Sequence, residues 1–200
     1  FADIVGFTSI SENIEPEEVQ KLLNEYWSYY NACARFYFGT VDKYIGDCMM
    51  LVFGVPTEDP KHQYNAVACA VLMQKLTERL NQRRKDQGLY AVELRVGINS
   101  GKMLAGLIGT SDRMEYTVVG DAVNLASRLC NEAEGAQIII EESLFENINP
   151  VHRLNVEAYK EISIRGKTDK VKIYSVNDVE HPYQVVMDDL ISDILSKNIQ

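Results

Sequence analysis

The sequence has little positive charge, and this shortage excludes one class of partner. Lysine and arginine together number 20 against 29 aspartates and glutamates, so the 200 residues carry a net charge of −9. A nucleic-acid backbone is bound mainly by neutralising its phosphates, which an acidic chain does poorly. A small polyanion is not excluded, because one local basic pocket can bind it whatever the net charge. We therefore expect no nucleic-acid partner.

Cysteine is also sparse, and its spacing excludes a zinc site. The four cysteines contain no C-x-x-C pair, and the three histidines are scattered along the chain. No N-x-S/T glycosylation signal occurs either. These features are typical of a cytosolic domain with reduced thiols.

Apolar runs long enough to span a membrane are missing as well. We therefore expect a cytoplasmic domain that makes no membrane contact of its own. The chain starts with Phe1 inside an apparent strand. Whether the full-length protein carries upstream segments, such as a membrane anchor, stays open.

What the sequence does contain is an alternation of strand-like and helical segments. Apolar spacing predicts helices from Pro16, over 60–84, over 121–136 and over 186–198. Strand patterns predict a first strand at 1–5, a hairpin over 39–54 that turns at Gly46-Asp47, and a terminal hairpin over 162–176. The segment 92–109 reads as two strands joined by a tight Asn-Ser-Gly turn. This order predicts an α+β fold with a mixed sheet and helices packed on it.

Two aspartates stand out in these strands. Asp3 lies in the apolar run "FADIV", and Asp47 lies at the tip of the first hairpin. Carboxylates suit Mg²⁺ and Mn²⁺, and the turn "VGFTS" after Asp3 offers backbone N–H groups, including those of Phe7 and Thr8, to a triphosphate. Taken singly, an aspartate at a strand end is often a cap, and Gly-Asp in a hairpin is often only a turn. The pattern suggests a metal–phosphate site without establishing one.

Three longer segments resemble a known family. "FADIVGFTSISE", "GTVDKYIGDCMMLVFG" and "EYTVVGDAVNLASRL" are similar, in order and spacing, to the signature segments of the class III nucleotidyl cyclase catalytic domain. The resemblance covers residues 1 to about 176 and favours the threonine-type adenylate cyclases found in bacteria. It implies a ferredoxin-like, palm-like βαββαβ core and conversion of ATP to 3′,5′-cyclic AMP and pyrophosphate for intracellular signalling. It divides the chain into a catalytic domain, 1–176, and a C-terminal helical extension, 177–200.

The resemblance also assigns roles to metal and adenine ligands. Asp3 and Asp47, with the Ile4 carbonyl, match the ligands of two Mg²⁺ or Mn²⁺ ions. The charge of these bound cations would explain why the Asp3 carboxylate is tolerated among apolar neighbours. Lys43 and Thr117 match the pair that reads adenine. Guanylyl cyclases place glutamate and cysteine there, and many adenylyl cyclases have aspartate where this chain has Thr117. Because a hydroxyl donates as well as accepts, rejection of GTP is less secure with threonine.

Further roles concern the ribose and the phosphates. Asn124 and Arg128 are four residues apart on one helix face and match the residues that orient the ribose and stabilise charge on the α-phosphoryl group. A basic residue for the β- and γ-phosphates is implied in the terminal hairpin, where Arg165 and Lys167 are both candidates. The "GKT" there is not a P-loop, because Glu161 stands where a glycine is required.

The resemblance implies a homodimer with two shared sites, each taking its metal ligands from one subunit and its base, ribose and arginine contacts from the other. ATP is then the substrate. Thr117 alone suggests bicarbonate regulation, because the threonine form also resembles that of the bicarbonate-responsive soluble animal enzymes. A guanylyl or dual-specificity cyclase is one alternative, against which Lys43 argues. A catalytically dead regulatory module is another, against which the presence of Asp3, Asp47, Asn124 and Arg128 argues.

Overall fold

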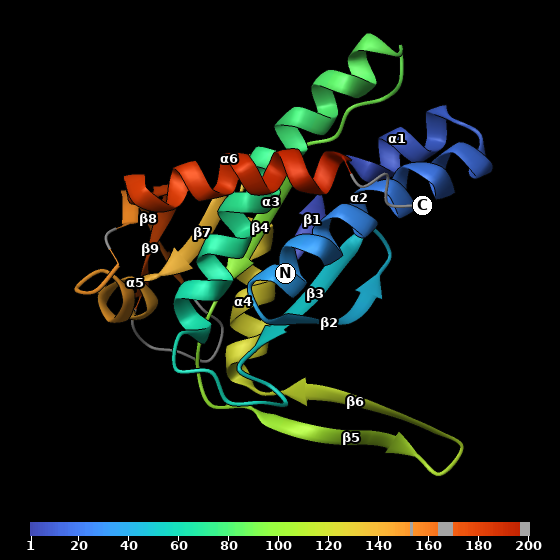
Figure 1. The fold of residues 1–200 in the computed structure, drawn as a ribbon. Coiled ribbons are helices and arrows are strands. Elements are labelled where there is room, and N and C mark those ends of the chain that lie inside the picture. The colour runs from blue at the N-terminus through green and yellow to red at the C-terminus, as the bar shows by residue number, and fades with distance from the viewer. Residues whose placement is uncertain (153, 164–169, 197–200) are drawn as a thin grey trace.

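The strands assemble in an order that differs from their order in the chain. The computed structural model describes residues 1–152, 154–163 and 170–196 (Figure 1). Its elements are β1 (Ala2–Ile4), α1 (Phe7–Asn13), α2 (Pro16–Phe36), β2 (Gly39–Ile45), β3 (Cys48–Phe53), α3 (His62–Asp86), β4 (Leu94–Ile98), β5 (Leu104–Thr110), β6 (Arg113–Val119), α4 (Asp121–Glu132), β7 (Ile138–Glu141), α5 (Glu142–Ile148), β8 (Leu154–Ser163), β9 (Lys170–Val179) and α6 (His181–Ser196).

The larger sheet contains the expected core. Its strand order in the described chain is β2-β3-β1-β4-β7-β9-β8, and the first four of these strands with the helices between them form the βαββαβ unit. All its neighbours pair antiparallel except β4 and β7, which run parallel. The α+β prediction with a ferredoxin-like core and a mixed sheet is confirmed.

Local chemistry explains where the first elements begin and turn. Pro16 stands at the start of α2, followed by Glu17 and Glu18 in the first turn. Acidic side chains there interact favourably with the positive end of the helix dipole. Gly46 has a φ of 64°, a left-handed conformation that glycine adopts at little cost, and it closes the turn between β2 and β3. That turn places Asp47 immediately before β3.

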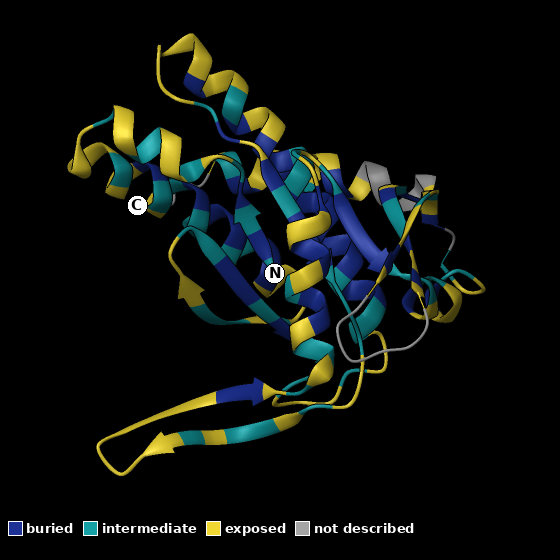
Figure 2. Cartoon of the chain, turned by 180° about the vertical axis from the view of Figure 1, so that it is seen from behind, coloured by how far each residue is buried: buried dark blue, intermediate teal, exposed yellow. Residues whose placement is uncertain are grey.

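Helices cover both faces of the larger sheet. α2, α3 and α6 lie on one face, and α4 lies on the other, as the opposite views in Figures 1 and 2 show. Successive side chains of β7 point to opposite faces of the sheet. Ile138 and Ile140 pack in the core on the side of α3. Ile139 packs on the other side, against Leu125 and Leu129 of α4. Gly97 lets α4 approach β4 closely, since a Cβ there would collide with the backbone of Cys130.

Helix α3 is buried more completely than its sequence pattern predicts. The pattern predicts one apolar stripe, but every residue from Val67 to Met73 is buried. The reason is that the middle of α3 contacts the sheet, α2 and α6. Its C-terminal part projects beyond the sheet (Figure 1) and carries Arg83, Arg84 and Lys85 in the last turn.

Strands β5 and β6 form a separate two-stranded arm. They pair antiparallel with each other and not with the larger sheet, and Figure 1 shows the arm projecting from the body of the domain. The predicted tight Asn-Ser-Gly turn is therefore wrong: residues 99–103 carry the chain from the larger sheet to the arm. Figure 2 shows the outer part of the arm largely exposed.

The C-terminal helix α6 shares the main core. Met187, Ile191 and Ile194 are buried against the layer that contains α3. The division of the chain at residue 176 stays a prediction.

All four cysteines are free thiols. Among the residues that the structure describes, no helix is both long and apolar enough to cross a membrane.

Candidate active site

Asp3 of β1 and Asp47 of the turn between β2 and β3 are here called the carboxylate pair. In β1, Asp3 is paired in register with Cys48 of β3, and Asp47 directly precedes that cysteine. Burial raises the pKa of Asp47, backbone hydrogen bonding to its own N–H lowers it, and the neighbouring charge of Asp3 raises it further. The fold therefore brings together two carboxylates that are 44 residues apart in the sequence.

The carboxylate pair fits a magnesium-type site that substrate would complete. No cluster of three or more histidine, cysteine, aspartate or glutamate side chains that could hold a metal occurs among the described residues. Mg²⁺ usually takes only one or two protein carboxylates, and substrate phosphates and water supply its other ligands. The Ile4 carbonyl, which follows Asp3 directly, is a further oxygen at the end of β1.

Arg95 is a residue of this site that the sequence analysis missed. It pairs in register with Asp3, and its Nε and Nη2 donate to Asp3 Oδ2 at 2.8 and 2.6 Å. The explanation that bound cations alone compensate Asp3 therefore needs correction, because an arginine already does so. The signal was present in "VELRVGI", where an arginine interrupts an apolar strand just as Asp3 does.

Lys43 and Thr117 both contact Asp42, an acidic residue that the sequence analysis also missed. The Thr117 hydroxyl donates to Asp42 Oδ2 at 2.8 Å, and Lys43 Nζ lies 3.5 Å from the same oxygen. Lys43 Nζ also donates to Glu115 Oε2 at 3.1 Å, and this bond is the main reason its pKa is raised. After the role that the resemblance implies for Lys43 and Thr117, the four residues Asp42, Lys43, Glu115 and Thr117 are called the base-reading cluster below.

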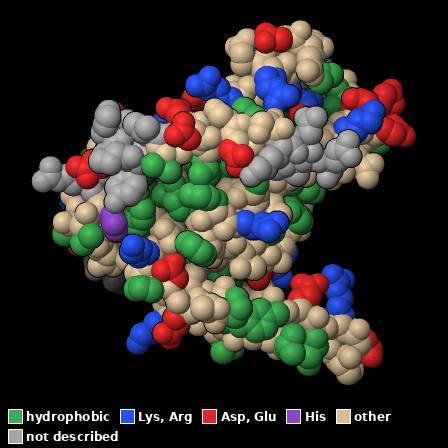
Figure 3. All heavy atoms as spheres, viewed as in Figure 1, with side chains coloured by type: hydrophobic (Ala, Val, Ile, Leu, Met, Phe, Trp, Pro, Cys, Tyr) green, Lys and Arg blue, Asp and Glu red, His purple; other side chains and the backbone are tan. Residues whose placement is uncertain are grey.

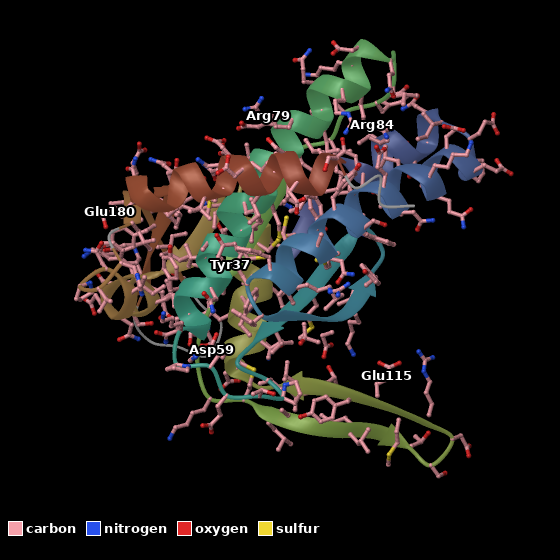
Figure 4. All side chains as sticks on the ribbon, in the orientation of Figure 1. Tyr37, Asp59, Arg79, Arg84, Glu115 and Glu180 are labelled. Carbon is pink, nitrogen blue, oxygen red and sulfur yellow. The ribbon has the colours of Figure 1, made fainter. Side chains whose placement is uncertain are left out.

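A bulge in β2 explains how neighbouring residues reach the same side. The pairing of β2 with β3 shifts by one residue between Val41 and Lys43, which leaves Asp42 as the extra residue. Without the shift, Asp42 and Lys43 would point to opposite faces of the strand. Glu115 and Thr117 are two residues apart on β6 and so share a face. Figure 4 shows Glu115 on the side of the arm that faces the body of the domain.

Asn124 and Arg128 occupy the exposed face of α4. Leu125 and Leu129, each one residue further on, are buried against the sheet, so the polar pair points outward. The predicted shared face of Asn124 and Arg128 is thus present. Thr117 is linked to this helix by only three residues, which ties the base-reading cluster to α4.

The remaining predicted contacts fall at two places. Phe7 and Thr8 begin α1 directly after Gly6, and the first N–H groups of a helix have no partner within it. Arg165 and Lys167 lie outside the described residues.

A large cavity lies away from the predicted site. It has a volume of about 520 Å³ and a mainly apolar lining that includes Met50, Phe53 and Met73, and none of the predicted site residues lines it. The predicted site residues lie outside this cavity, and they range from buried, as Ile4 and Thr117, to exposed, as Asn124 and Arg128.

Known proteins resemble this chain over nearly its whole length. Residues 1–178 match the family described as the adenylate and guanylate cyclase catalytic domain. An adenylate cyclase of Anabaena cylindrica is 34% identical over 183 residues, which are 88% of this chain and 36% of that protein. The chain thus spans little more than a third of that relative and still less of the similar adenylate cyclases of Rhizobium meliloti and Dictyostelium discoideum.

Two solved structures agree equally well with the fold. The adenylyl cyclase CyaB from P. aeruginosa is 37% identical, with a TM-score of 0.84 over 90% of this chain and 92% of that one. The guanylyl cyclase Cya2 is also 37% identical, with a TM-score of 0.84 over 91% of each chain. Overall similarity therefore does not choose between ATP and GTP. The signature segments, the βαββαβ core and these matches agree that the chain belongs to the adenylate and guanylate cyclase catalytic domain family.

Proposed function

We propose that this domain is an adenylate cyclase that converts ATP to 3′,5′-cyclic AMP and pyrophosphate for intracellular signalling. The observation that carries the choice of ATP is the base-reading cluster, in which Lys43 and Thr117 come together from β2 and β6. An ammonium donates to a ring nitrogen of adenine, and a hydroxyl can accept from its 6-amino group. A lysine in this place has no acceptor to offer the N1–H of guanine.

Each group of residues then has one task in the reaction. The 3′-oxygen bonds to the α-phosphorus, the bond to the α,β-bridging oxygen breaks, pyrophosphate leaves with the electron pair, and the 3′-hydroxyl proton is released. Asn124 orients the ribose, and Arg128 binds the charge that develops on the α-phosphoryl oxygens. Backbone N–H groups of Phe7 and Thr8 bind phosphate oxygens, and so does a basic residue, Arg165 or Lys167.

Cyclases of this family depend on divalent metal. Asp3, Asp47 and the Ile4 carbonyl would hold two Mg²⁺ or Mn²⁺ ions, which when bound polarise the reacting oxygens and offset the triphosphate charge. Arg95 of β4 holds the Asp3 side chain of β1 in place through two charge-assisted hydrogen bonds.

We further infer a homodimer with two shared sites. The carboxylate pair of one subunit works with the base-reading cluster, Asn124 and Arg128 of the other. The support is the arm face, defined as Leu107, Met114 and Tyr116. These residues lie on one side of β5 and β6 and are 66%, 56% and 50% exposed. Figure 3 shows hydrophobic side chains gathered on the arm. Large exposed apolar side chains on a projecting ribbon are typical of a protein interface.

The test is product formation from ATP and from GTP, with Mg²⁺ or Mn²⁺, over a series of protein concentrations. Cyclic AMP with a specific activity that rises with protein concentration is the expected result. Cyclic GTP as the main product would instead favour the guanylyl cyclase reading, which similarity to Cya2 keeps as the second candidate. A folded dimer that binds nucleotide but makes neither product would be a regulatory module.

Bicarbonate regulation is a separate proposal that rests on Thr117 alone. Activity should rise when bicarbonate replaces chloride at fixed pH and ionic strength. An unchanged rate under those conditions would remove this proposal without affecting the cyclase reaction.

A further inference from the structure

We propose that Asp42 is a specificity-determining positioning residue, which fixes the hydroxyl of Thr117 as a hydrogen-bond acceptor toward the base. The proposal rests on the function proposed above, in which Thr117 faces the 6-position of the purine. Asp42 does not touch the base itself in this scheme. It acts through Thr117.

The contact itself sets the direction of the hydrogen bond. An ionised carboxylate only accepts, so in the 2.8 Å contact with Asp42 Oδ2 the Thr117 hydroxyl must donate its single hydrogen. What remains on that oxygen toward the base is lone pairs. Thr117 can then accept from the 6-amino group of adenine but has no hydrogen to give to the 6-oxo group of guanine. The pair thus presents the same acceptor-only surface as the aspartate of many other adenylyl cyclases.

Burial makes this arrangement persistent. The Asp42 side chain is only 4% exposed, and Thr117 is 8% exposed. A carboxylate removed from water in this way is costly unless it is hydrogen-bonded, and its partners are the Thr117 hydroxyl and the Lys43 ammonium. Turning the hydroxyl away would leave the carboxylate short of a donor, so the hydroxyl is not free to rotate toward guanine.

The local fold provides this contact through an irregular element. Asp42 is the extra residue of the β2 bulge, and its side chain reaches the same side of the strand as Lys43 only because of that bulge. Removing its carboxylate still leaves Lys43 bonded to Glu115 at 3.1 Å. The donor for the adenine ring nitrogen therefore survives in an Asp42 variant, and the expected change is confined to what Thr117 offers.

The test compares ATP with GTP in Asp42→Ala and in Asp42→Ala/Thr117→Asp. In Asp42→Ala the hydroxyl can donate to guanine, so the ATP:GTP ratio of kcat/KM should fall about tenfold to hundredfold, mainly through a lower KM for GTP. The double variant restores an acceptor-only group and should recover most of the ratio. Asp178→Ala, which removes an aspartate from another aspartate–lysine pair, is the matched control and should leave the ratio unchanged.

A purely structural Asp42 predicts a different pattern. Both nucleotides would then lose activity equally in Asp42→Ala, and Thr117→Asp would restore nothing; either result overturns the proposal. If Asp42→Ala fails to fold, Asp42→Val carries the same prediction, because a β-branched apolar residue suits a strand.

Binding of 3′-deoxy-ATP and 3′-deoxy-GTP separates this proposal from the proposed function. These probes lack the attacking hydroxyl, so competition with a fluorescent nucleotide reports base recognition without turnover. Preference for 3′-deoxy-ATP that falls in Asp42→Ala, in a protein that makes no cyclic product, would support Asp42 and refute the cyclase. Cyclic AMP formation with a preference that Asp42→Ala does not change would do the reverse.

Discussion

The carboxylate pair and the base-reading cluster are built on different kinds of support. Asp3 lies on a central strand that is paired on both sides, and Arg95 on the neighbouring strand holds its side chain. The base-reading cluster joins the edge strand β2, through a bulge, to an arm outside the larger sheet. A site for metal needs fixed ligands, whereas a site that closes around a base can use elements that a second subunit moves. Regulation by subunit movement should therefore act on the base-reading side.

The largest expected effect comes from the carboxylate pair, which is called the rigid side below because the strand of Asp3 is paired on both sides. Asp47→Asn removes a proposed metal ligand while keeping the shape of the turn after Gly46. Cyclic AMP formation should fall about a thousandfold or more, because metal supplies several kcal/mol of transition-state stabilisation. Initial rates with Mn²⁺ and with Mg²⁺ measure this, with circular dichroism and sedimentation as controls for fold and dimer. A rate within tenfold of the unchanged protein would remove Asp47 from the metal site.

A slightly smaller loss is expected on the other side. Arg128→Ala takes a cation from the exposed face of α4 without disturbing the buried Leu125 and Leu129. Turnover should fall about a hundredfold to a thousandfold, as for other preorganised groups that bind developing charge. KM for ATP should change little, which separates this loss from weaker substrate binding. A large rise in KM with unchanged kcat would assign Arg128 to ground-state binding instead.

Mixing the two inactive variants tests whether the two sides meet across subunits. An Asp47→Asn/Arg128→Ala heterodimer has one site with both defects and one site with neither. Random exchange makes half of the dimers mixed, so a one-to-one mixture should recover roughly a quarter of the unchanged activity. The measurement is specific activity after co-incubation, with each variant alone at the same total concentration as the control. No recovery, despite demonstrated subunit exchange, would place both sides of the site within one chain.

The arm face should have a smaller effect, seen in dimer affinity. Leu107→Lys replaces an exposed apolar side chain by a charge that an apolar interface would have to desolvate. Dimer dissociation should become about tenfold to hundredfold more favourable, and specific activity should fall most at low protein concentration. Val151→Lys is the matched control, since Val151 is 74% exposed but lies outside the arm. Equal sedimentation behaviour of both variants would exclude the arm face from the dimer.

Sequence patterns predicted the rigid side better than the base-reading side. The strand of Asp3 and the hairpin of Asp47 follow from local periodicity and turn chemistry, and the structure contains both. On the other side, periodicity predicted only the helix of Asn124 and Arg128. Asp42 could not be found in this way, because strict alternation places it opposite Lys43 and only a bulge brings the two together. Bulges depend on pairing with another strand, which local patterns do not report.

The arm was misread for a related reason. The segment 92–109 does contain two strands, but whether consecutive strands pair with each other depends on competing partners. β4 is taken by β1 and β7, which leaves β5 to pair with β6. Arg95 was missed because an arginine in a strand has many surface explanations until the register shows Asp3 opposite it.

The smallest expected effect concerns stability, and it returns to Asp47. Burial raises its pKa in the folded protein, so the protonated form is favoured there more than in the unfolded chain. Its contribution to stability is therefore complete below the unfolded pKa and is lost as pH rises through the folded pKa. At neutral pH the charged carboxylate is slightly destabilising in the metal-free protein. Asp47→Asn should thus raise the metal-free Tm by a small amount at pH 7, and this gain should shrink toward pH 4.

When metal is present, the difference in Tm between Asp47→Asn and the unchanged protein should have the opposite sign. Mn²⁺ should raise the Tm of the unchanged protein, because a ligand that binds only the folded state stabilises it, and should do so much less in Asp47→Asn. Thermal unfolding with and without Mn²⁺ at two pH values therefore separates the cost of the carboxylate from its use. If Asp47→Asn lowered the metal-free Tm at pH 7, Asp47 would stabilise the hairpin in its own right, and the rigid side would owe part of its rigidity to this residue.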